Sequence, residues 1–149
     1  MSKLIIMQGI SGSGKSRVAR RLARRLHATV VSADAFTCLY TADGFHPELL
    51  GEAHRSCIHQ TARTILKGRH VIVDNTNLTV EEMLPYVLFG RALRLKVEVV
   101  RVECPQSVAF ARQKHGVPEK THKRQAARLA SFKVPTDWEV TVKMVKGSA

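Results

Sequence analysis

Residues 9–16 read GISGSGKS, and this stretch decides the fold of the chain. Gly9, Gly14, Lys15 and Ser16 fit the spacing G-x-x-x-x-G-K-[ST], which is typical of a loop that binds the phosphates of a nucleoside triphosphate. The pattern G-x-G-x-x-G of dinucleotide-binding proteins does not fit these glycines. The stretch therefore predicts a phosphate-binding loop that holds a nucleoside triphosphate.

The chemistry of such a loop assigns a role to each kind of group in it. We expect the backbone N–H groups of residues 10–16 to point inward around the phosphates, helped by the dipole of the helix that follows. Lys15 would reach the outer phosphates, and the Ser16 hydroxyl would ligate Mg²⁺. The predicted nucleotide-binding residues of this region are Gly9, Ser11, Gly12, Ser13, Gly14, Lys15, Ser16 and Arg17.

Apolar strand patterns alternate with helical patterns on both sides of the loop. We predict strands at 3–8, 29–32, 70–74, 95–103 and 138–144, and helices at 14–27, 47–67, 80–93, from 105 to the His115-Gly116 pair, and 118–132. This alternation predicts a five-stranded parallel sheet with helices on both faces, the three-layer α/β/α fold of P-loop NTPases. With 149 residues, the chain is expected to form one domain, 1–149.

The net charge of +12 is concentrated in two parts of the chain. Residues 1–30 hold seven Lys or Arg and no acid, residues 101–133 hold eight against two, and residues 31–100 hold seven against eight. A basic field of this size attracts polyanions, so it predicts nucleic acid as a partner, with a solubilising surface as the alternative. Five arginines share one face of the first predicted helix: Arg17, Arg20, Arg21, Arg24 and Arg25. One nucleotide cannot contact all five, and we interpret them as part of the attraction to a polyanionic acceptor, with a solvated face as the alternative.

Two of the four aspartates follow predicted strands at their carboxyl ends, where a parallel α/β sheet binds its ligands. Asp74 ends the strand of 70–74 and matches the apolar-strand-then-Asp pattern that holds Mg²⁺. Asp34 lies just beyond the strand of 29–32 and could orient or deprotonate an attacking hydroxyl. Capping or turn roles are the structural alternatives for both.

The residue after Asp74 is Asn75 rather than a glutamate, which weakens the case for a hydrolase. A transferase needs arginines that close over the γ-phosphate and exclude water. The predicted lid, 105–133, is interrupted by Gly116 and Pro118 and supplies such arginines, with a solvated helix face as the alternative for each: Arg112, Arg124 and Arg128. Arg112 is the predicted catalytic residue of the lid, and Arg124 is expected to contact the nucleotide.

Five stretches together resemble the P-loop polynucleotide kinases, represented by the bacteriophage polynucleotide 5′-hydroxyl kinase domain and its relatives. They are the phosphate loop, SADAF at 32–36, AHRSC at 53–57, VIVDNTNL at 71–78 and ARQKHGVP at 111–118. The resemblance extends through nearly the whole chain. It implies an adenylate-kinase-like sheet with a helical lid, ATP with Mg²⁺, and transfer of the γ-phosphoryl group to a hydroxyl of a nucleic acid.

The resemblance also implies roles for single residues. It implies that Lys15 and Ser16 contact the ATP phosphates and that Asp34 is the general base. Thr76 and Asn77 take places in the acceptor groove, and Arg112 a place in the lid. Beside Asp34, Phe36 is a candidate for stacking on a base of the acceptor.

The identity of the acceptor stays open at the level of sequence. Thr37 stands where the kinase that defines the family carries an arginine that grips acceptor phosphate. This difference weakens the case for a 5′ end as the acceptor. A polynucleotide 5′-hydroxyl is the first candidate and a 5-hydroxymethyluracil within phage DNA a close second, with DNA favoured over RNA. A nucleic-acid-stimulated ATPase and a nucleoside or other small-molecule kinase remain as further alternatives.

The sequence carries no signal for export or for a membrane. The N-terminus lacks the pattern of a signal peptide, and no apolar run reaches the length of a membrane-spanning helix. The three cysteines are widely spaced and form no C-x-x-C pair, which suits a reducing compartment. We expect a cytoplasmic protein, in the host cell if the chain is phage-encoded, with no membrane association and no obligate protein partner.

Overall fold

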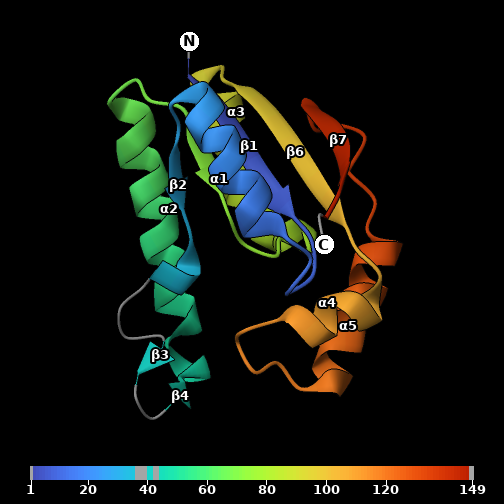
Figure 1. The fold of residues 1–149 in the computed structure, drawn as a ribbon. Coiled ribbons are helices and arrows are strands. Elements are labelled where there is room, and N and C mark those ends of the chain that lie inside the picture. The colour runs from blue at the N-terminus through green and yellow to red at the C-terminus, as the bar shows by residue number, and fades with distance from the viewer. Residues whose placement is uncertain (1, 36–39, 42–43, 148–149) are drawn as a thin grey trace.

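Five parallel strands form one sheet in the order β2-β5-β1-β6-β7 (Figure 1). The computed structural model describes residues 2–35, 40–41 and 44–147, so Phe36 and Thr37 lie outside the described residues. The strands of the sheet are β1 (Lys3–Gln8), β2 (Thr29–Val31), β5 (Val71–Val73), β6 (Lys96–Glu103) and β7 (Val140–Lys146). The predicted five-stranded parallel sheet is confirmed.

Helices cover both faces of this sheet and complete the three layers. Helix α1 (Lys15–Leu26) packs its apolar side on one face, against side chains of β1, β5 and β6. Helices α2 (Leu50–Leu66) and α3 (Val80–Leu93) pack on the other face, in a core that contains Cys57, Tyr86 and Val99. Because the central strands are covered on both faces, residues 4–7 of β1 and all of β5 are apolar and buried, as is typical of parallel strands. The three-layer α/β/α prediction is confirmed.

Local sequence signals set most of the helix ends. Thr79 caps α3, where its hydroxyl accepts a hydrogen bond from the Glu82 backbone N–H at 3.2 Å. The predicted helix of 47–67 begins instead as a 3₁₀ turn, η2 (Pro47–Leu49), and becomes α-helical at Leu50. A short antiparallel pair, β3 (Tyr40–Thr41) with β4 (Gly44–Phe45), was not among the predicted strands.

The predicted lid consists of two helices at the carboxyl ends of the strands (Figure 1). Helix α4 (Gln106–Arg112) and helix α5 (Glu119–Ser131) pack against each other, and the connection between them turns at Gly116, whose φ is +67°. The Arg101 side chain of β6 donates a hydrogen bond to the Leu129 carbonyl, which ties α5 to the sheet. Within the described residues, no helix is both long enough and apolar enough to cross a membrane.

Candidate active site

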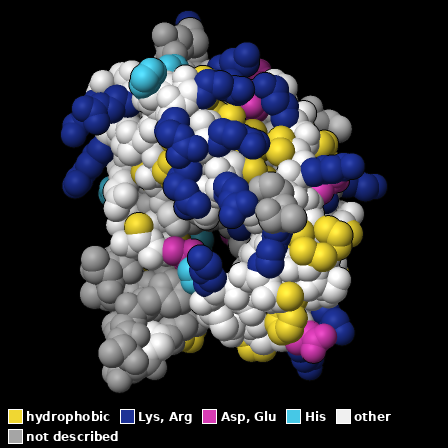
Figure 2. Space-filling model, in the orientation of Figure 1, with side chains coloured by type: hydrophobic (Ala, Val, Ile, Leu, Met, Phe, Trp, Pro, Cys, Tyr) yellow, Lys and Arg dark blue, Asp and Glu magenta, His cyan; other side chains and the backbone are white. Residues whose placement is uncertain are grey.

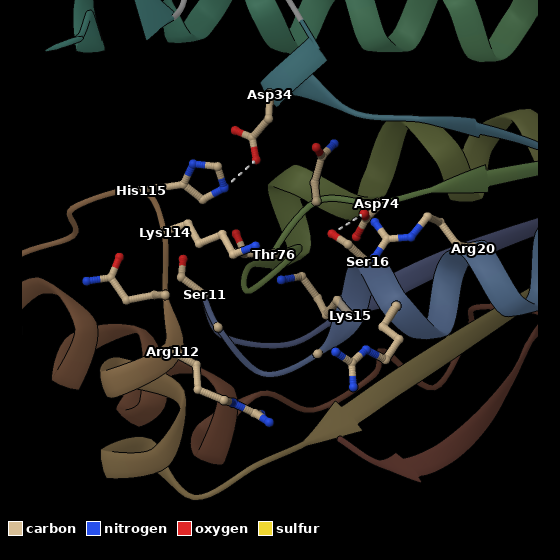
Figure 3. Close-up of a pocket in the computed structure, with 15 residues that line it drawn as sticks. Ser11, Lys15, Ser16, Arg20, Asp34, Asp74, Thr76, Arg112, Lys114 and His115 are labelled. Carbon is tan, nitrogen blue, oxygen red and sulfur yellow. Dashed lines mark hydrogen bonds and ion pairs between the residues drawn. The ribbon is translucent and has the colours of Figure 1, made fainter. Parts of the chain in front are cut away.

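A cavity of about 430 Å³ opens at the carboxyl ends of the parallel strands, between the loop before α1 and the connection that follows α4 (Figure 3). Most of the residues predicted from the sequence meet there. The predicted residues that line the cavity are Ser11, Gly12, Gly14, Lys15, Ser16, Arg17, Asp34, Asp74, Thr76 and Arg112. The site therefore lies where the topology of a parallel α/β sheet places a ligand.

The phosphate loop needs its glycines for backbone conformation and for close packing. Gly12 and Gly14 have φ values of +80° and +96°, in the left-handed region that side chains other than glycine rarely adopt. A Cβ at Gly12 would also collide with the Ala109 carbonyl of α4. The Gly9 N–H donates to the Thr76 carbonyl at 3.1 Å, which fixes the loop to the chain that follows β5.

The side chain of Lys15 lies against the phosphate loop. Its Nζ donates to the Ile10 carbonyl at 3.3 Å, and Figure 3 shows the side chain reaching into the cavity. Burial lowers the pKa of Lys15 below its ordinary value, while the carboxylates of Asp74 and Asp34 oppose that shift. The lysine is therefore a desolvated cation that faces two carboxylates, and binding of phosphate would supply further negative charge.

Ser16 and Asp74 form a pair of oxygen ligands at one side of the cavity. The Ser16 hydroxyl donates to Asp74 Oδ2 at 2.7 Å (Figure 3). Asp74 Oδ1 is buried and has no hydrogen-bond partner among the described residues. Mg²⁺ prefers oxygen ligands and is commonly held by one or two protein oxygens together with phosphates and water. These two side chains fit that requirement, and Asp74 Oδ1 is the atom that most needs a cation.

Asp34 approaches the cavity from the opposite side, on the short 3₁₀ turn η1 (Ala33–Ala35). Asn75, directly after Asp74, fixes this turn because its Oδ1 accepts from the Ala33 N–H at 2.8 Å. The side chain of Asp34 is half exposed, and its Oδ2 lies 3.4 Å from Nε2 of His115 (Figure 3). The structure thus places a carboxylate at the mouth of the cavity, facing the phosphate loop.

Arg112 and His115 bring the end of α4 and the following turn to the same cavity. Arg112 Nη2 lies 3.2 Å from the sulfur of Cys104, to which it donates a hydrogen bond. The pairing of His115 with Asp34 was not predicted from the sequence. The end of α4 therefore supplies a cation beside the loop, and the connection after α4 supplies a direct contact to the candidate base.

Asn77 was predicted to line the acceptor groove, and the structure places it elsewhere. Its side chain is buried beneath the loop and donates to the Met7 carbonyl at 2.8 Å, while its own carbonyl accepts from Gln8. A φ of +49° directs the chain into this position. Asn77 is a structural residue that joins the segment after β5 to β1, and it does not line the cavity.

Three predicted nucleotide-binding residues also lie outside the cavity. Arg124 is exposed on α5 and lines no part of it, because the helix directs other residues toward the loop. Gly9 and Ser13 lie beneath the loop, where Ser13 is buried and donates its N–H to the Ile10 carbonyl at 3.1 Å. The Ser11 N–H donates to the Gln125 side chain at 3.1 Å. The N–H groups of 10–16 therefore do not all point toward the cavity.

Support of the phosphate loop by α5 was not predicted from the sequence. His122 of α5 is fully buried, and its Nε2 lies 2.7 Å from the Ser11 carbonyl. Because a carbonyl only accepts, Nε2 carries the proton, and Nδ1 faces the Gln106 side chain at 2.9 Å. With the bond from the Ser11 N–H to Gln125, both backbone groups of Ser11 are held by α5. The helix fixes one side of the loop without lining the cavity.

Replacing His122 with alanine is expected to loosen the loop, since it leaves the Ser11 carbonyl and the Gln106 amide without their partner and opens a void. We expect ATP affinity to fall by about tenfold and the free energy of unfolding by about 2 to 4 kcal/mol. Calorimetric titration with ATP and Mg²⁺, together with urea unfolding, measures the two effects. The matched control is His59→Ala, at an exposed position on α2. Unchanged ATP affinity in the His122 variant would contradict the role of the contact.

Comparisons with known proteins agree with the fold described above. A sugar kinase from Janibacter sp. HTCC2649 matches with a TM-score of 0.67 and 18% identity, over 97% of this chain and 86% of that chain. A gluconokinase from Sinorhizobium meliloti 1021 matches with a TM-score of 0.62 and 17% identity, over 96% and 82% of the two chains. A chain of the Pnkp1/Rnl/Hen1 complex matches with a TM-score of 0.64 and 18% identity, over 93% of this chain and 44% of that chain. At these identities the likeness shows the fold alone.

The sequence has no significant match among curated proteins. It does match the family AAA_33, described as an AAA domain, over residues 4–136. That range begins in β1 and continues past the end of α5, so it includes the phosphate loop and every described residue that lines the cavity. Since the match spans most of the chain, the protein belongs to the AAA_33 family.

Proposed function

We propose that this protein is an ATP-dependent kinase that transfers the γ-phosphoryl group to a hydroxyl carried by a nucleic acid, with a polynucleotide 5′-hydroxyl as the first candidate. One observation carries the proposal. The cavity has a phosphate loop on one side and the carboxylate of Asp34 on the other, and two arginines of a strongly basic helix, Arg17 and Arg20, line it as well. The cavity therefore combines a donor site, a candidate base and a positively charged surface that could attract the acceptor.

The donor side would hold ATP through charge and backbone groups. Lys15 and the loop bind the phosphates, and Arg112 adds positive charge from the end of α4. A bound Mg²⁺, held by Ser16 and Asp74, would neutralise negative charge on the phosphates. These residues position the γ-phosphoryl group and stabilise the charge that spreads over it during transfer.

The acceptor side would be organised by Asp34. The acceptor hydroxyl donates a hydrogen bond to the carboxylate, which orients the oxygen toward the γ-phosphorus and takes up its proton. The new bond joins the acceptor oxygen to the γ-phosphorus, and the bond between that phosphorus and the oxygen bridging to the β-phosphate breaks. ADP leaves with that bridging oxygen. His115 would have to share or release Asp34 when the hydroxyl arrives, since the two side chains are paired.

A kinase of small molecules is the alternative to a kinase of nucleic acids, because a sugar kinase and a gluconokinase share this fold. The net charge of +12 favours the polymer, since a small acceptor gains little from so large a basic field. The salt dependence of the KM for the acceptor distinguishes the two candidates. The KM for a polynucleotide acceptor should rise steeply with added salt because binding releases counterions, whereas the KM for a small acceptor should change little.

The experiment that tests the proposal is transfer of label from γ-labelled ATP to a panel of acceptors. The panel contains linear DNA and RNA with 5′-hydroxyl ends, the same strands with 5′-phosphate ends, circular DNA with and without 5-hydroxymethyluracil, nucleosides and gluconate. We expect label on strands with free 5′-hydroxyl ends, and more on DNA than on RNA.

Each other outcome identifies an alternative. Label on the circle that contains 5-hydroxymethyluracil, and not on the plain circle, would exclude a 5′ end and favour a DNA base kinase. Label on gluconate or nucleosides alone would favour a small-molecule kinase. Release of inorganic phosphate that rises with nucleic acid, without any labelled acceptor, would favour a nucleic-acid-stimulated ATPase.

A further inference from the structure

The exposed side of α1 forms a row of five arginines, which we name the arginine face: Arg17, Arg20, Arg21, Arg24 and Arg25. All five are exposed, and α1 contains no acidic residue. Figure 2 shows Lys and Arg side chains gathering over α1 and the strands beside it, down to a hollow in this face of the molecule. The face is therefore a continuous cationic surface and not a set of scattered charges.

The arginine face begins inside the cavity and leads out of it. Arg17 and Arg20 line the cavity, whereas Arg21, Arg24 and Arg25 lie farther along α1. From Arg17 to Arg25 the helix rises about 12 Å, and guanidinium groups recur about every 5.4 Å, once per helical turn. This repeat is close to the separation of neighbouring phosphates in an extended strand. A strand that leaves the cavity along α1 would meet one or two arginines at each step.

Four of the five charges on this face have little internal compensation. Among the residues that the structure describes, none forms an ion pair with Arg20, Arg21, Arg24 or Arg25. Elsewhere on this side of the sheet the pattern differs, because Lys3 and Lys143 both pair with Glu98, at 3.0 and 3.3 Å. Like charges three and four residues apart destabilise a helix. An external polyanion would relieve the repulsion that the folded chain leaves in place.

We infer that the arginine face binds the phosphate backbone of the nucleic acid whose terminal hydroxyl enters the cavity, and that this strand runs from the cavity mouth toward the C-terminal end of α1. The inference rests on the proposed function for the identity of the bound strand. The contacts are to phosphates, so they set affinity and register without reading base sequence. The face has room for a few nucleotides beyond the one that reacts.

The test is the variant Arg21→Gln/Arg24→Gln/Arg25→Gln, which leaves every cavity residue intact. Glutamine keeps a high helix propensity, so the variant should fold, and thermal unfolding checks this. The matched control removes the same charge from α2 and the turn after it, on the other face of the sheet: Arg63→Gln/Lys67→Gln/Arg69→Gln. All three control side chains are exposed and line no part of the cavity.

Binding of a fluorescent single-stranded oligonucleotide is measured by anisotropy over a range of salt concentrations, without ATP. We expect the α1 variant to bind about 10- to 100-fold more weakly at low salt, and its slope of log K against log salt to be reduced by about 2. The control should lose far less. Equal losses in the two variants would overturn the inference, as would an α1 variant that binds the strand like the unmodified protein. Unmodified protein that binds vesicles of anionic lipid through these arginines, and no oligonucleotide, would also overturn it.

Label transfer separates this inference from the proposed function. If the α1 variant phosphorylates the strand with unchanged KM, the arginine face is not the path and the kinase assignment stands. If the unmodified protein binds the strand through α1 but transfers no label to it, the surface stands and the kinase assignment fails. A nucleoside acceptor, where one is used, should react equally in both variants because it does not reach the face.

Discussion

Replacing Asp34 with asparagine is expected to lower the kcat of phosphoryl transfer by about 10²- to 10⁴-fold, the range that a positioned general base contributes. The amide has the size of the carboxylate but cannot take up the proton of the acceptor hydroxyl. ATP affinity should stay close to that of the unmodified protein, because Asp34 lies on η1 at the mouth of the cavity and outside the phosphate loop. The signature is a loss in kcat without a loss in ATP binding.

The measurement combines label transfer at saturating acceptor with calorimetric titration of ATP and Mg²⁺. The matched control is Asp137→Asn, an exposed aspartate that does not line the cavity. Normal turnover by the Asp34 variant would remove this residue from the mechanism. Loss of ATP binding together with turnover would instead assign Asp34 to the donor site.

Local sequence patterns predicted the fold because each element carries its own signal. The run of β1, the loop of 9–16 and the Thr79 cap each determine structure within a few residues. The pairing of Ser16 with Asp74 was also predictable in outline, since the carboxyl ends of neighbouring parallel strands meet at one edge of a sheet. Topology thus converts two separate motifs into one site.

Contacts between segments that are far apart in the chain could not be predicted from the sequence. His122 and Ser11 are 111 positions apart, and nothing in the pattern of α5 distinguishes a buried histidine from a solvated one. In the polar stretch after β5, the difficulty concerns neighbouring residues: two positions predicted to share one site lie in different places. Thr76 lines the cavity while Asn77 turns beneath it, and the left-handed backbone at Asn77 is only weakly indicated by its residue type, because asparagine adopts this conformation more often than most residues.

Replacing Lys15 with methionine is expected to abolish nucleotide binding and transfer together, in contrast to the Asp34 variant. Methionine keeps roughly the length and the apolar stem of the side chain, and it removes the charge together with the hydrogen bond that Nζ donates to the Ile10 carbonyl. Phosphates would then face a loop without its cation, beside the carboxylates of Asp74 and Asp34. We expect kcat/KM to fall by about 10³-fold or more. A ligand at about 100 times its Kd stabilises the protein that binds it by about 2.7 kcal/mol. Saturating ATP should give this stabilisation to the unmodified protein and not to the methionine variant.

The same change is expected not to destabilise the free protein, and this distinguishes a functional lysine from a structural one. Burial lowers the pKa of Lys15 in the folded state below 10.5, its ordinary value, so folding carries a cost at every pH where the folded lysine is charged. Between the lowered pKa and 10.5 the unfolded chain binds more protons, so the stability of the unmodified protein rises with pH in that window. The methionine variant lacks this cost at neutral pH and should be at least as stable there.

Urea unfolding of both proteins without nucleotide, at neutral pH and at a pH approaching 10.5, measures this difference. The advantage of the methionine variant should shrink as the pH rises, because deprotonation removes the cost in the unmodified protein. Lys120→Met, at an exposed position of α5, is the control and should show no such trend. A Lys15 variant that is less stable at neutral pH would mean that the attraction of Asp74 and Asp34 outweighs the cost of burial. Lys15 would then hold the empty site together as well as binding phosphate.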